Sequence, residues 1–545
     1  MQSTAMVKVA EMMHIVMVPW PSQGHLNGIL RLARYLVDEE GVLVTFVYPN
    51  CLYQLALNRG QSKAALSKTA EDAGANAATT PLFLSENLHI EVVEDGLPLD
   101  KAPDLGSFAS SISTFRQGVQ LLLRELIRPA PSLCSNGDGL KSYTHSWPTP
   151  RCVVADTFIP WVQDLADAVG IPRVDFWTST AAVYSMGSQM ELLVSKGVLP
   201  LSKSCWVDQD TKWTAIAPFI EGAPGLPPFP VTELPVEFIR PEAATAPEFQ
   251  FMLNAFSRIP EAHTILIHTL HELERPVIEG LRAAELPVYA VGPLPEGLPF
   301  TTGSASSAVA TNDCLQWLDT QSPCSVVYVA LGTIVKPTAA ELHSLALGLE
   351  ASQRPFLWVI RPDLIGTNQS LADALPSGFL QRTVDRGHAL VVPWAPQTQV
   401  LAHASIGVFL SHCGWNSTLE SMLEGVPMVA CPRAAEQRSN AKWITEIWKM
   451  GVAMEMREDG SFSKEAVESA LRNALSEDGS VFFRKQARHF KQLARAAFQR
   501  EGSSRANIQH FLRILRSLNE QNSGKEQHQE GSAKSFIGVL GSFAS

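Results

Sequence analysis

The sequence has little of what nucleic-acid-binding and membrane-spanning proteins require. Its 545 residues include 43 lysines and arginines against 54 aspartates and glutamates, which gives a formal net charge of −11 at pH 7. A chain with this charge is repelled by the phosphates of nucleic acids and of anionic membranes. No segment reaches the about 18 consecutive apolar residues that a membrane-spanning helix needs. We therefore expect neither nucleic acid nor stable membrane insertion among its interactions.

Cysteine is scarce, and its spacing indicates neither a disulfide framework nor a metal site. The eight cysteines are scattered and form no CxxC pair, a pattern that suits a reducing compartment. The first 25 residues lack the charged start, the apolar stretch and the cleavage site of a signal peptide. We expect a cytoplasmic protein, and a monomer.

The glycine motif of dinucleotide-binding enzymes is also missing. No G-x-G-x-x-G follows the first predicted strand, where the chain reads PSQGHLNG (21–28) instead. A dinucleotide-dependent oxidoreductase is a rival suggested by the Rossmann-like alternation of elements, and the missing motif argues against it.

Short apolar runs alternate with amphipathic helical stretches along the chain. Continuous Val- and Ile-rich runs are typical of parallel strands buried on both faces, which helices must connect. The predicted strands are 14–20, 42–49, 88–94, 152–158, 173–178 and 264–269 in the first half, and 325–332, 355–360, 388–394, 406–412 and 427–432 in the second. The length is too great for a single core. The pattern predicts an α/β protein with two doubly wound parallel-sheet domains.

Composition shifts divide the chain. Residues 1–290 are predicted to form the N-terminal domain, and a segment rich in Gly, Pro, Ser and Thr makes 291–311 a linker. The C-terminal domain then covers 312–502. A helical pattern follows over 503–520, and the composition of 521–545 predicts a disordered tail.

The segment FLSHCGWNSTLESMLEGVP (409–427) has a pattern that suits phosphate binding. A predicted strand ends at His412 and a helix follows, and ligands of open parallel sheets bind at the carboxyl ends of the strands. Gly414 permits close approach of the backbone, while Asn416 and Ser417 lie where the free N–H groups and the positive end of a helix point outward. We expect the helix start and His412 to supply positive potential without a metal.

Ser417 and Glu420 also fit a capping box, which would give both residues a purely structural role. Two further strand ends favour the binding interpretation. WAPQTQVLAH carries Trp394 and Gln397, and EGVPMVACPRAAEQ carries Glu436 and Gln437. An aromatic ring for a base, a helix start for phosphates and carboxylate–amide pairs for hydroxyls together indicate a nucleotide-sugar site.

A histidine and an aspartate follow strands of the N-terminal half. His25 comes shortly after the first strand, and Asp156 ends the run VVAD. Transfer of a sugar to a hydroxyl needs a base, which histidine can provide. Each residue has a structural alternative, since a lone histidine there is usually a capping or surface residue and such an aspartate is often a turn residue.

The 44 residues from Trp394 to Gln437 resemble, nearly residue for residue, the donor-binding box of plant secondary-product UDP-glycosyltransferases. That box reads WAPQ, then HCGWNS with a glutamate four residues after the asparagine, then GVP, then an acidic residue and glutamine. The resemblance continues through PSQGHLNGILRLA, VADTFIPWVQDLADAVG and SVVYVALGT. It implies a GT-B fold, inverting transfer from a UDP-sugar to a hydroxyl of a small lipophilic acceptor, and a terminal helix (503–520) that packs back on the N-terminal domain.

The resemblance implies roles for individual residues. His25 is the base and Asp156 orients it, while Trp177 and Tyr184 are candidates for the acceptor pocket. The uracil meets Trp394 and Ala395, and the ribose meets Gln397 and Glu420. The diphosphate is surrounded by Thr333, His412, Asn416 and Ser417, and the sugar faces Trp415, Glu436 and Gln437.

The resemblance implies no cofactor and no metal besides the UDP-sugar co-substrate. Asp208 and Asp210 have the DxD spacing that holds Mn²⁺ or Mg²⁺ in the other major glycosyltransferase fold, but they lie in a polar segment far from the phosphate turn. We interpret them as a solvated loop.

Gln437 goes with glucose in the family, which makes UDP-glucose the expected donor. Arg433 keeps UDP-glucuronate open as an alternative, because a guanidinium pairs well with a carboxylate. Thr333 replaces a serine, and its hydroxyl should still reach phosphate. Arg433 and Ala434 replace a usual aromatic pair, and Cys431 stands where tryptophan is frequent. These departures concern the choice of sugar and the shape of the pocket, not the UDP site.

The acceptor is not identified by the sequence. The apolar stretches of the N-terminal half favour flavonoids, phenolics or terpenoids. A catalytically inactive protein that binds a nucleotide sugar or a small molecule is the non-enzyme alternative, and retention of His25 and Asp156 argues against it.

Overall fold

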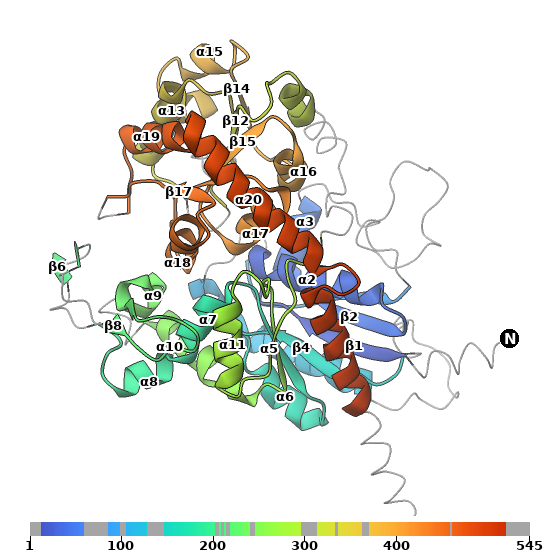
Figure 1. Ribbon diagram of the computed structural model, residues 1–545. Helices are drawn as coiled ribbons and strands as arrows, with labels where there is room; N and C mark the ends of the chain where they lie inside the picture. The colour runs from blue at the N-terminus through green and yellow to red at the C-terminus, as the bar shows by residue number, and fades with distance from the viewer. Residues whose placement is uncertain are drawn as a thin grey trace, which may run out of the picture.

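The computed structural model describes residues 12–58, 86–98, 105–127, 147–201, 206–208, 212–213, 219–239, 246–295, 313–332, 336–361, 370–457 and 460–518. These residues form two parallel β-sheets, each flanked by helices, in an N-terminal and a C-terminal domain (Figure 1). The predicted α/β class with two doubly wound parallel sheets is confirmed.

The N-terminal sheet has seven strands in the order β11-β10-β5-β4-β1-β2-β3, and every pair is parallel. Its strands are β1 (Met13–Val18), β2 (Val42–Pro49), β3 (Leu88–Val93), β4 (Cys152–Asp156), β5 (Arg173–Trp177), β10 (Thr264–Ile267) and β11 (Val288–Ala290). Strands β1, β2, β4, β5 and β10 are buried at every position, as continuous apolar runs predict.

The C-terminal sheet has six parallel strands in the order β14-β13-β12-β15-β16-β17. They are β12 (Val326–Ala330), β13 (Phe356–Val359), β14 (Ala389–Val392), β15 (Ile406–Ser411), β16 (Met428–Ala430) and β17 (Gly451–Ala453). The predicted strands omit β11 and β17. Both are three-residue strands at a sheet edge, too short to produce a recognisable pattern.

Five helices start directly after strands and position the site. They are α2 (Gln23–Val37), α6 (Val162–Val169), α16 (Gln397–Ala402), α17 (Trp415–Glu424) and α18 (Gln437–Lys442). The other helices are α3 (Asn50–Asn58), α5 (Leu105–Ile127), α7 (Ala181–Ser188), α8 (Met190–Ser195), α9 (Val236–Ile239), α10 (Pro247–Ser257), α11 (Arg275–Ala283), α13 (Ala339–Ser352), α14 (Leu371–Ala374), α15 (Phe379–Thr383), α19 (Lys464–Ala474) and α20 (Glu477–Ala497), with short turns η3 (Val231–Glu233) and η5 (Ile259–Glu261) and the π-helix η7 (Trp443–Ile447).

Two small antiparallel pairs lie outside the main sheets. They are β6 (Trp206–Asp208) with β7 (Lys212–Trp213), and β8 (Phe219–Ile220) with β9 (Phe229–Pro230). Asp208 ends β6, and Asp210 lies outside the described residues.

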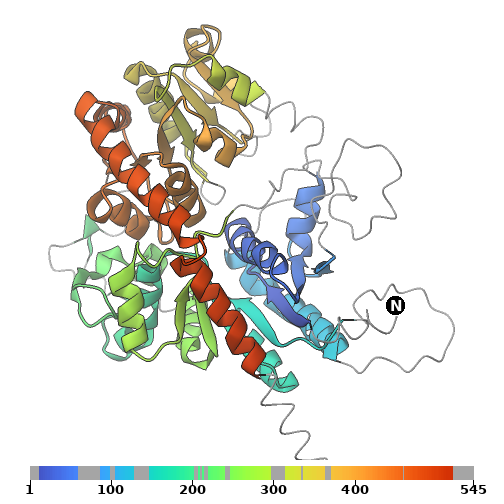
Figure 2. The same ribbon diagram turned by 45° about the vertical axis from the view of Figure 1, so that its right-hand side comes forward.

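The chain returns to the N-terminal domain at its end. After α20, residues 503–518 form a helix beside the N-terminal sheet (Figure 2). Its side chains Ile508, Phe511, Leu512 and Leu515 are buried in the same apolar cluster as β1 and α2. Ser504 Oγ donates to the carbonyl of Gly292 at 2.5 Å. Residues 521–545 lie outside the described residues.

The N-terminal domain extends slightly beyond the predicted boundary. Val291 and Leu294, placed in the linker from composition, are fully buried in the N-terminal core. None of the helices in the described ranges is long and apolar enough to cross a membrane.

Candidate active site between the two domains

His25 and Asp156 lie in contact, although 131 residues separate them. Strands β1 and β4 are neighbours, so the start of α2 and the last residue of β4 meet at the carboxyl edge of the sheet. His25 Nδ1 lies 2.7 Å from Asp156 Oδ2 and 3.1 Å from the hydroxyl of Thr178. The other carboxylate oxygen of Asp156 accepts from the backbone N–H of Phe158 at 3.0 Å. Both oxygens of the carboxylate are therefore held in place.

The electrostatics of His25 suit a base. Burial by itself would lower the pKa of His25, but the charge and the hydrogen bond of Asp156 outweigh burial, and Glu436 of the C-terminal domain adds to them, so the pKa lies above its ordinary value. A carboxylate can only accept a hydrogen bond, so Nδ1 carries the proton and Nε2 is the basic nitrogen. The imidazole side chain is 20% exposed, while Asp156 is buried.

An aromatic wall adjoins the histidine. The ring of Phe158 lies 5.2 Å from that of His25 between centroids, and it contacts Trp177 and Phe251 at 5.6 and 5.9 Å. Trp177 is nearly fully buried and donates through Nε1 to the carbonyl of Thr180. Phe158 and Phe251 are half-buried. Phe158 and Phe251 are not among the site residues predicted from the sequence. Phe158 could have been predicted as a site residue, because it stands two residues after Asp156.

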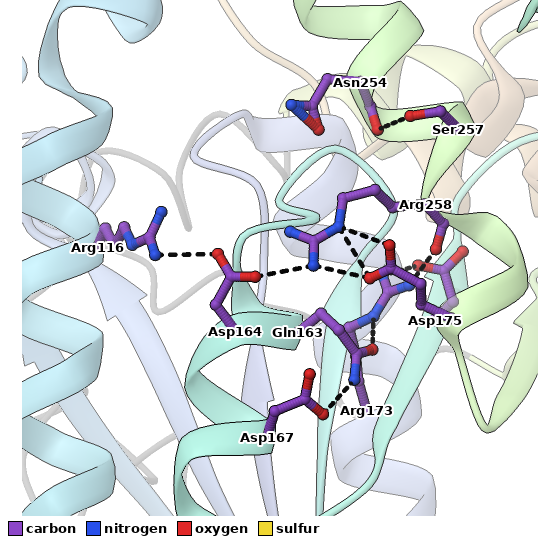
Figure 3. Close-up of polar contacts among 10 residues, drawn as sticks. Arg116, Gln163, Asp164, Asp167, Arg173, Asp175, Asn254, Ser257 and Arg258 are labelled. Carbon is purple, nitrogen blue, oxygen red and sulfur yellow. Dashed lines mark hydrogen bonds and ion pairs between the residues drawn. The ribbon is translucent and has the colours of Figure 1, made fainter.

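Tyr184 lies in the core, contrary to the prediction that it lines an acceptor pocket. It is fully buried, and its hydroxyl donates to Asp175 at 2.9 Å. Asp175 also accepts from Thr157, the neighbour of Asp156, and from Arg173. Figure 3 shows how Arg173 connects this buried carboxylate to Gln163 of α6. Tyr184 therefore belongs to the buried hydrogen-bond network that includes Thr157, the neighbour of Asp156.

The same network continues to the surface of the N-terminal domain. Asp164 of α6 accepts from Arg116 of α5 at 3.0 Å and from Arg258 at 2.8 Å (Figure 3). The backbone carbonyl of Arg258 in turn accepts from Arg173. On the outside, Asp164 thus connects α6 to α5 and to Arg258 at the end of α10. Inside, Arg173 of β5 connects Gln163 of α6 to the carbonyl of Arg258.

The turn between β15 and α17 packs tightly around His412. Added Cβ atoms at Gly332 and Gly414 would lie 2.5 and 2.4 Å from His412 Nε2, so both positions need glycine. Burial lowers the pKa of His412 to about 4. The lowered pKa favours a neutral ring, which can supply a hydrogen bond; the positive potential predicted for His412 stays a prediction. The start of α17 provides positive potential through the helix dipole.

The capping-box alternative for Ser417 and Glu420 is also wrong. Helix α17 begins at Trp415 with Gly414 as its N-cap, and no side chain caps it. Ser417 is therefore inside the first turn. Its hydroxyl and one Glu420 oxygen both accept from Gln397 Nε2, at 3.0 and 2.7 Å. The structure thus brings together Gln397 and Glu420, the two residues assigned to the ribose.

Two residues assigned to the sugar have other contacts. Trp415 is buried, and its Nε1 donates to the carbonyl of His268 in the N-terminal domain at 2.7 Å. That side chain packs between the domains, and its place beside the sugar stays a prediction. Gln437 is buried, and its Oε1 accepts from the N–H groups of Arg433 and Ala434 at 2.8 and 3.0 Å. Gln437 thus holds the loop before α18.

The remaining predicted donor residues are positioned as follows. Trp394 is 38% exposed, which leaves its ring accessible, and Ala395 is buried. Glu436 stands at the N-cap of α18. Asn416 Nδ2 donates to the carbonyl of Gly24, next to His25, at 2.7 Å. Thr333 lies outside the described residues.

Arg433 is engaged by other groups. Its guanidinium pairs with Glu341 at 2.5 Å and donates to the carbonyl of Gly460 at 3.0 Å. Both charged side chains are nearly buried. Within the described part of the chain, no three His, Cys, Asp or Glu side chains are grouped as metal ligands.

Comparison with known proteins places this geometry in a family. A sequence profile described as "UDP-glucoronosyl and UDP-glucosyl transferase" matches residues 300–489. UDP-glycosyltransferase 85A2 of Arabidopsis thaliana is 31% identical over 92% of this chain and 97% of its own. The 7-deoxyloganetin glucosyltransferase of Gardenia jasminoides is 31% identical over 94% and 99%.

Solved structures agree. A UDP-glucosyltransferase from Polygonum tinctorium, capable of glucosylating indoxyl and solved with 3,4-dichloroaniline, has a TM-score of 0.70 and 25% identity over 93% of this chain and 99% of that one. Two facing α/β domains with a nucleotide-sugar site define a GT-B glycosyltransferase. This chain belongs to the plant UDP-glycosyltransferase family, as its donor-binding box predicted.

Proposed function

We propose that this protein transfers glucose from UDP-glucose to a hydroxyl of a small lipophilic acceptor, with inversion at the anomeric carbon. The observation that carries this proposal is the 2.7 Å contact between His25 and Asp156. It lies at the edge of the N-terminal sheet, where Asn416 of the donor turn contacts Gly24 beside the histidine. The base and the donor segment thus meet across the domain interface.

The proposed step is a single displacement. His25 Nε2 takes the proton of the acceptor hydroxyl as its oxygen bonds to the anomeric carbon, and the bond from that carbon to the UDP oxygen breaks. Attack from the face opposite UDP inverts the configuration. Asp156 stabilises the imidazolium that forms, and its fixed orientation keeps Nε2 available.

The departing UDP carries negative charge, which the C-terminal domain has groups to stabilise. Free N–H groups at the start of α17 and the positive end of that helix are available to phosphate oxygens. His412 adds a neutral hydrogen-bonding group. We propose that these groups replace a metal ion, with Thr333, Asn416 and Ser417 completing the phosphate site.

The C-terminal domain also has groups suited to the uracil and the ribose. Trp394 offers an accessible ring for stacking, Ala395 a backbone edge, and Gln397 with Glu420 a hydrogen-bonding pair for the ribose. On the sugar side, the carboxylate of Glu436 acts electrostatically on His25, which suits a position beside the transferred sugar. Gln437 uses its oxygen to shape the loop, which leaves its amide group for the sugar.

UDP-glucose is the donor best supported. The Gardenia relative is named as a glucosyltransferase. Arg433, which suggested UDP-glucuronate, is paired with Glu341 and bonded to Gly460, so its guanidinium is less suited to a sugar carboxylate.

The aromatic wall supports a lipophilic acceptor. Phe158 and Phe251 can contact a planar ring beside His25, which fits phenolics, flavonoids or compact terpenoids. We also propose a cytoplasmic monomer. The six cysteines in the described ranges are free, as expected in a reducing compartment.

The test is to incubate the protein with UDP-glucose and a panel of hydroxylated aromatics and terpenoids, and to look for a mass gain of one hexose. UDP-glucuronate and UDP-galactose serve as competing donors. UDP binding without any hexose transfer across the panel would instead support the inactive binding protein.

A further inference from the structure

A buried ion pair joins the helix that carries the base to the helix that carries the ribose-binding carboxylate. Arg31 of α2 donates through Nη2 to Glu420 Oε1 of α17 at 2.5 Å. Each side chain is only 9% exposed. The pair thus spans the two domains, which Figure 1 shows meeting near α2 and α17.

The pair belongs to a continuous hydrogen-bonded chain. The second oxygen of Glu420 accepts from Gln397, whose own oxygen accepts from the hydroxyl of Tyr328 on β12 at 3.2 Å. The carboxylate is therefore held from the C-terminal domain by Gln397 and from the N-terminal domain by Arg31. A carboxylate can accept about four hydrogen bonds, so lone pairs remain for ribose hydroxyls.

Arg31 is rigidly connected to His25. The two residues are six positions apart on one helix, about 9 Å along its axis. A second contact, from Asn416 to the carbonyl of Gly24, attaches the start of the same helix to α17. A third, from Trp415 to the carbonyl of His268, lies beside it. Helix α17 is thus docked on the N-terminal domain at three points around the base.

We propose that Arg31 is a positioning residue that couples nucleotide binding to the placement of His25. This inference rests on the proposed function, since it takes Glu420 as the ribose-binding group. A nucleotide that bonds Glu420 then acts on a carboxylate already attached to α2. Binding and docking favour each other, and this coupling is reciprocal.

A purely structural role makes a different prediction. A buried ion pair is by itself weak evidence for stability, but removing one partner leaves an uncompensated buried charge. Arg31→Met would then lower the melting temperature only. If Arg31 is a positioning residue, folded Arg31→Met must in addition show lower UDP affinity and a lower kcat.

The experiment compares full-length wild type with Arg31→Met, Arg31→Lys and a matched control, Lys442→Met. Lys442 also forms an ion pair across the domains, with Glu233, but away from α2. We expect Arg31→Met to weaken UDP binding, measured by calorimetry, by about tenfold, within the usual range of coupling between sites. With UDP-glucose, kcat should fall as well, and Arg31→Lys should recover part of both losses. Lys442→Met should keep both values.

A second variant separates charge compensation from positioning. Adding Glu420→Gln to Arg31→Met removes the unpaired carboxylate, so the melting temperature should rise again. Because Glu420 also binds the ribose, the double variant is compared with Glu420→Gln alone, and the two should bind UDP with the same affinity if Arg31 acts through Glu420. A double variant that binds UDP much more weakly than Glu420→Gln, or folded Arg31→Met with affinity and kcat within about twofold of wild type, would overturn the proposal. So would equal losses in Lys442→Met. Because calorimetry needs no acceptor, the result stands apart from whether the wild type transfers glucose.

Discussion

The two domains hold their functional side chains in different ways. In the C-terminal domain, Gln397, Ser417 and Glu420 come from one box and bond one another within 23 residues of sequence. In the N-terminal domain, His25 depends on Asp156, 131 residues away. The donor side can therefore be recognised from a local motif, whereas the catalytic pair exists only because β1 and β4 are neighbours in the sheet.

The largest expected effect is a loss of stability of the N-terminal domain when the terminal helix is deleted. Deleting the chain from Ser503 removes Ile508, Phe511, Leu512 and Leu515 from the N-terminal core. Burial of each such side chain contributes about 1.5–3 kcal/mol, so the loss approaches the whole stability of a domain, about 5–15 kcal/mol. We expect the N-terminal domain to unfold, seen as loss of activity and of a cooperative melting transition. Deletion from Gln521 is the control and should change neither.

His25→Ala should remove transfer while leaving the donor site. The variant lacks the base, so kcat should fall by about a thousandfold or more, whereas the dissociation constant of UDP, measured by calorimetry, should stay near the wild-type value. Equal loss of UDP binding would contradict the separation of the two functions between domains.

Asp156→Asn should lower kcat/KM by about a hundredfold or more and shift its pH dependence. Transfer needs neutral His25, so activity rises as the pH passes the pKa of His25. Asp156 raises that pKa; without the charge, the acidic limb should move to lower pH. An unmoved limb in a pH–rate profile would show that another group titrates there.

Arg433→Ala tests whether Arg433 determines which donor sugar is used. Removing the arginine leaves Glu341 without its ion-pair partner in a nearly buried position, although Thr338 still donates two hydrogen bonds to the carboxylate, so the melting temperature should fall. The preference for UDP-glucose over UDP-glucuronate, measured as a ratio of kcat/KM values, should remain. A wild-type preference for UDP-glucuronate that this variant loses would reinstate the arginine as a sugar ligand.

The smallest effect is expected from a chelator. Phosphate charge is met by the start of α17 in our proposal, so EDTA should leave the rate unchanged. If activity required Mn²⁺ and Asp208→Asn abolished this Mn²⁺-dependent activity, the metal-free mechanism would be wrong.

The sequence alone determined much of this protein. Long Val- and Ile-rich runs predicted the central strands of both sheets, because strands buried on both faces need apolar side chains at every position. The donor-binding box predicted the family, since its residues are close in sequence and each has a distinct chemical task.

Only the tertiary structure decided the rest. The edge strands β11 and β17 form because a neighbouring strand offers hydrogen bonds to three residues with no pattern of their own. Tyr184 and Trp415 have side chains equally suited to a pocket and to a core, and packing placed one on Asp175 and the other between the domains. The pairing of Arg31 with Glu420 joins residues 389 positions apart. No local pattern can specify such a contact, because it depends on how two separately formed domains meet.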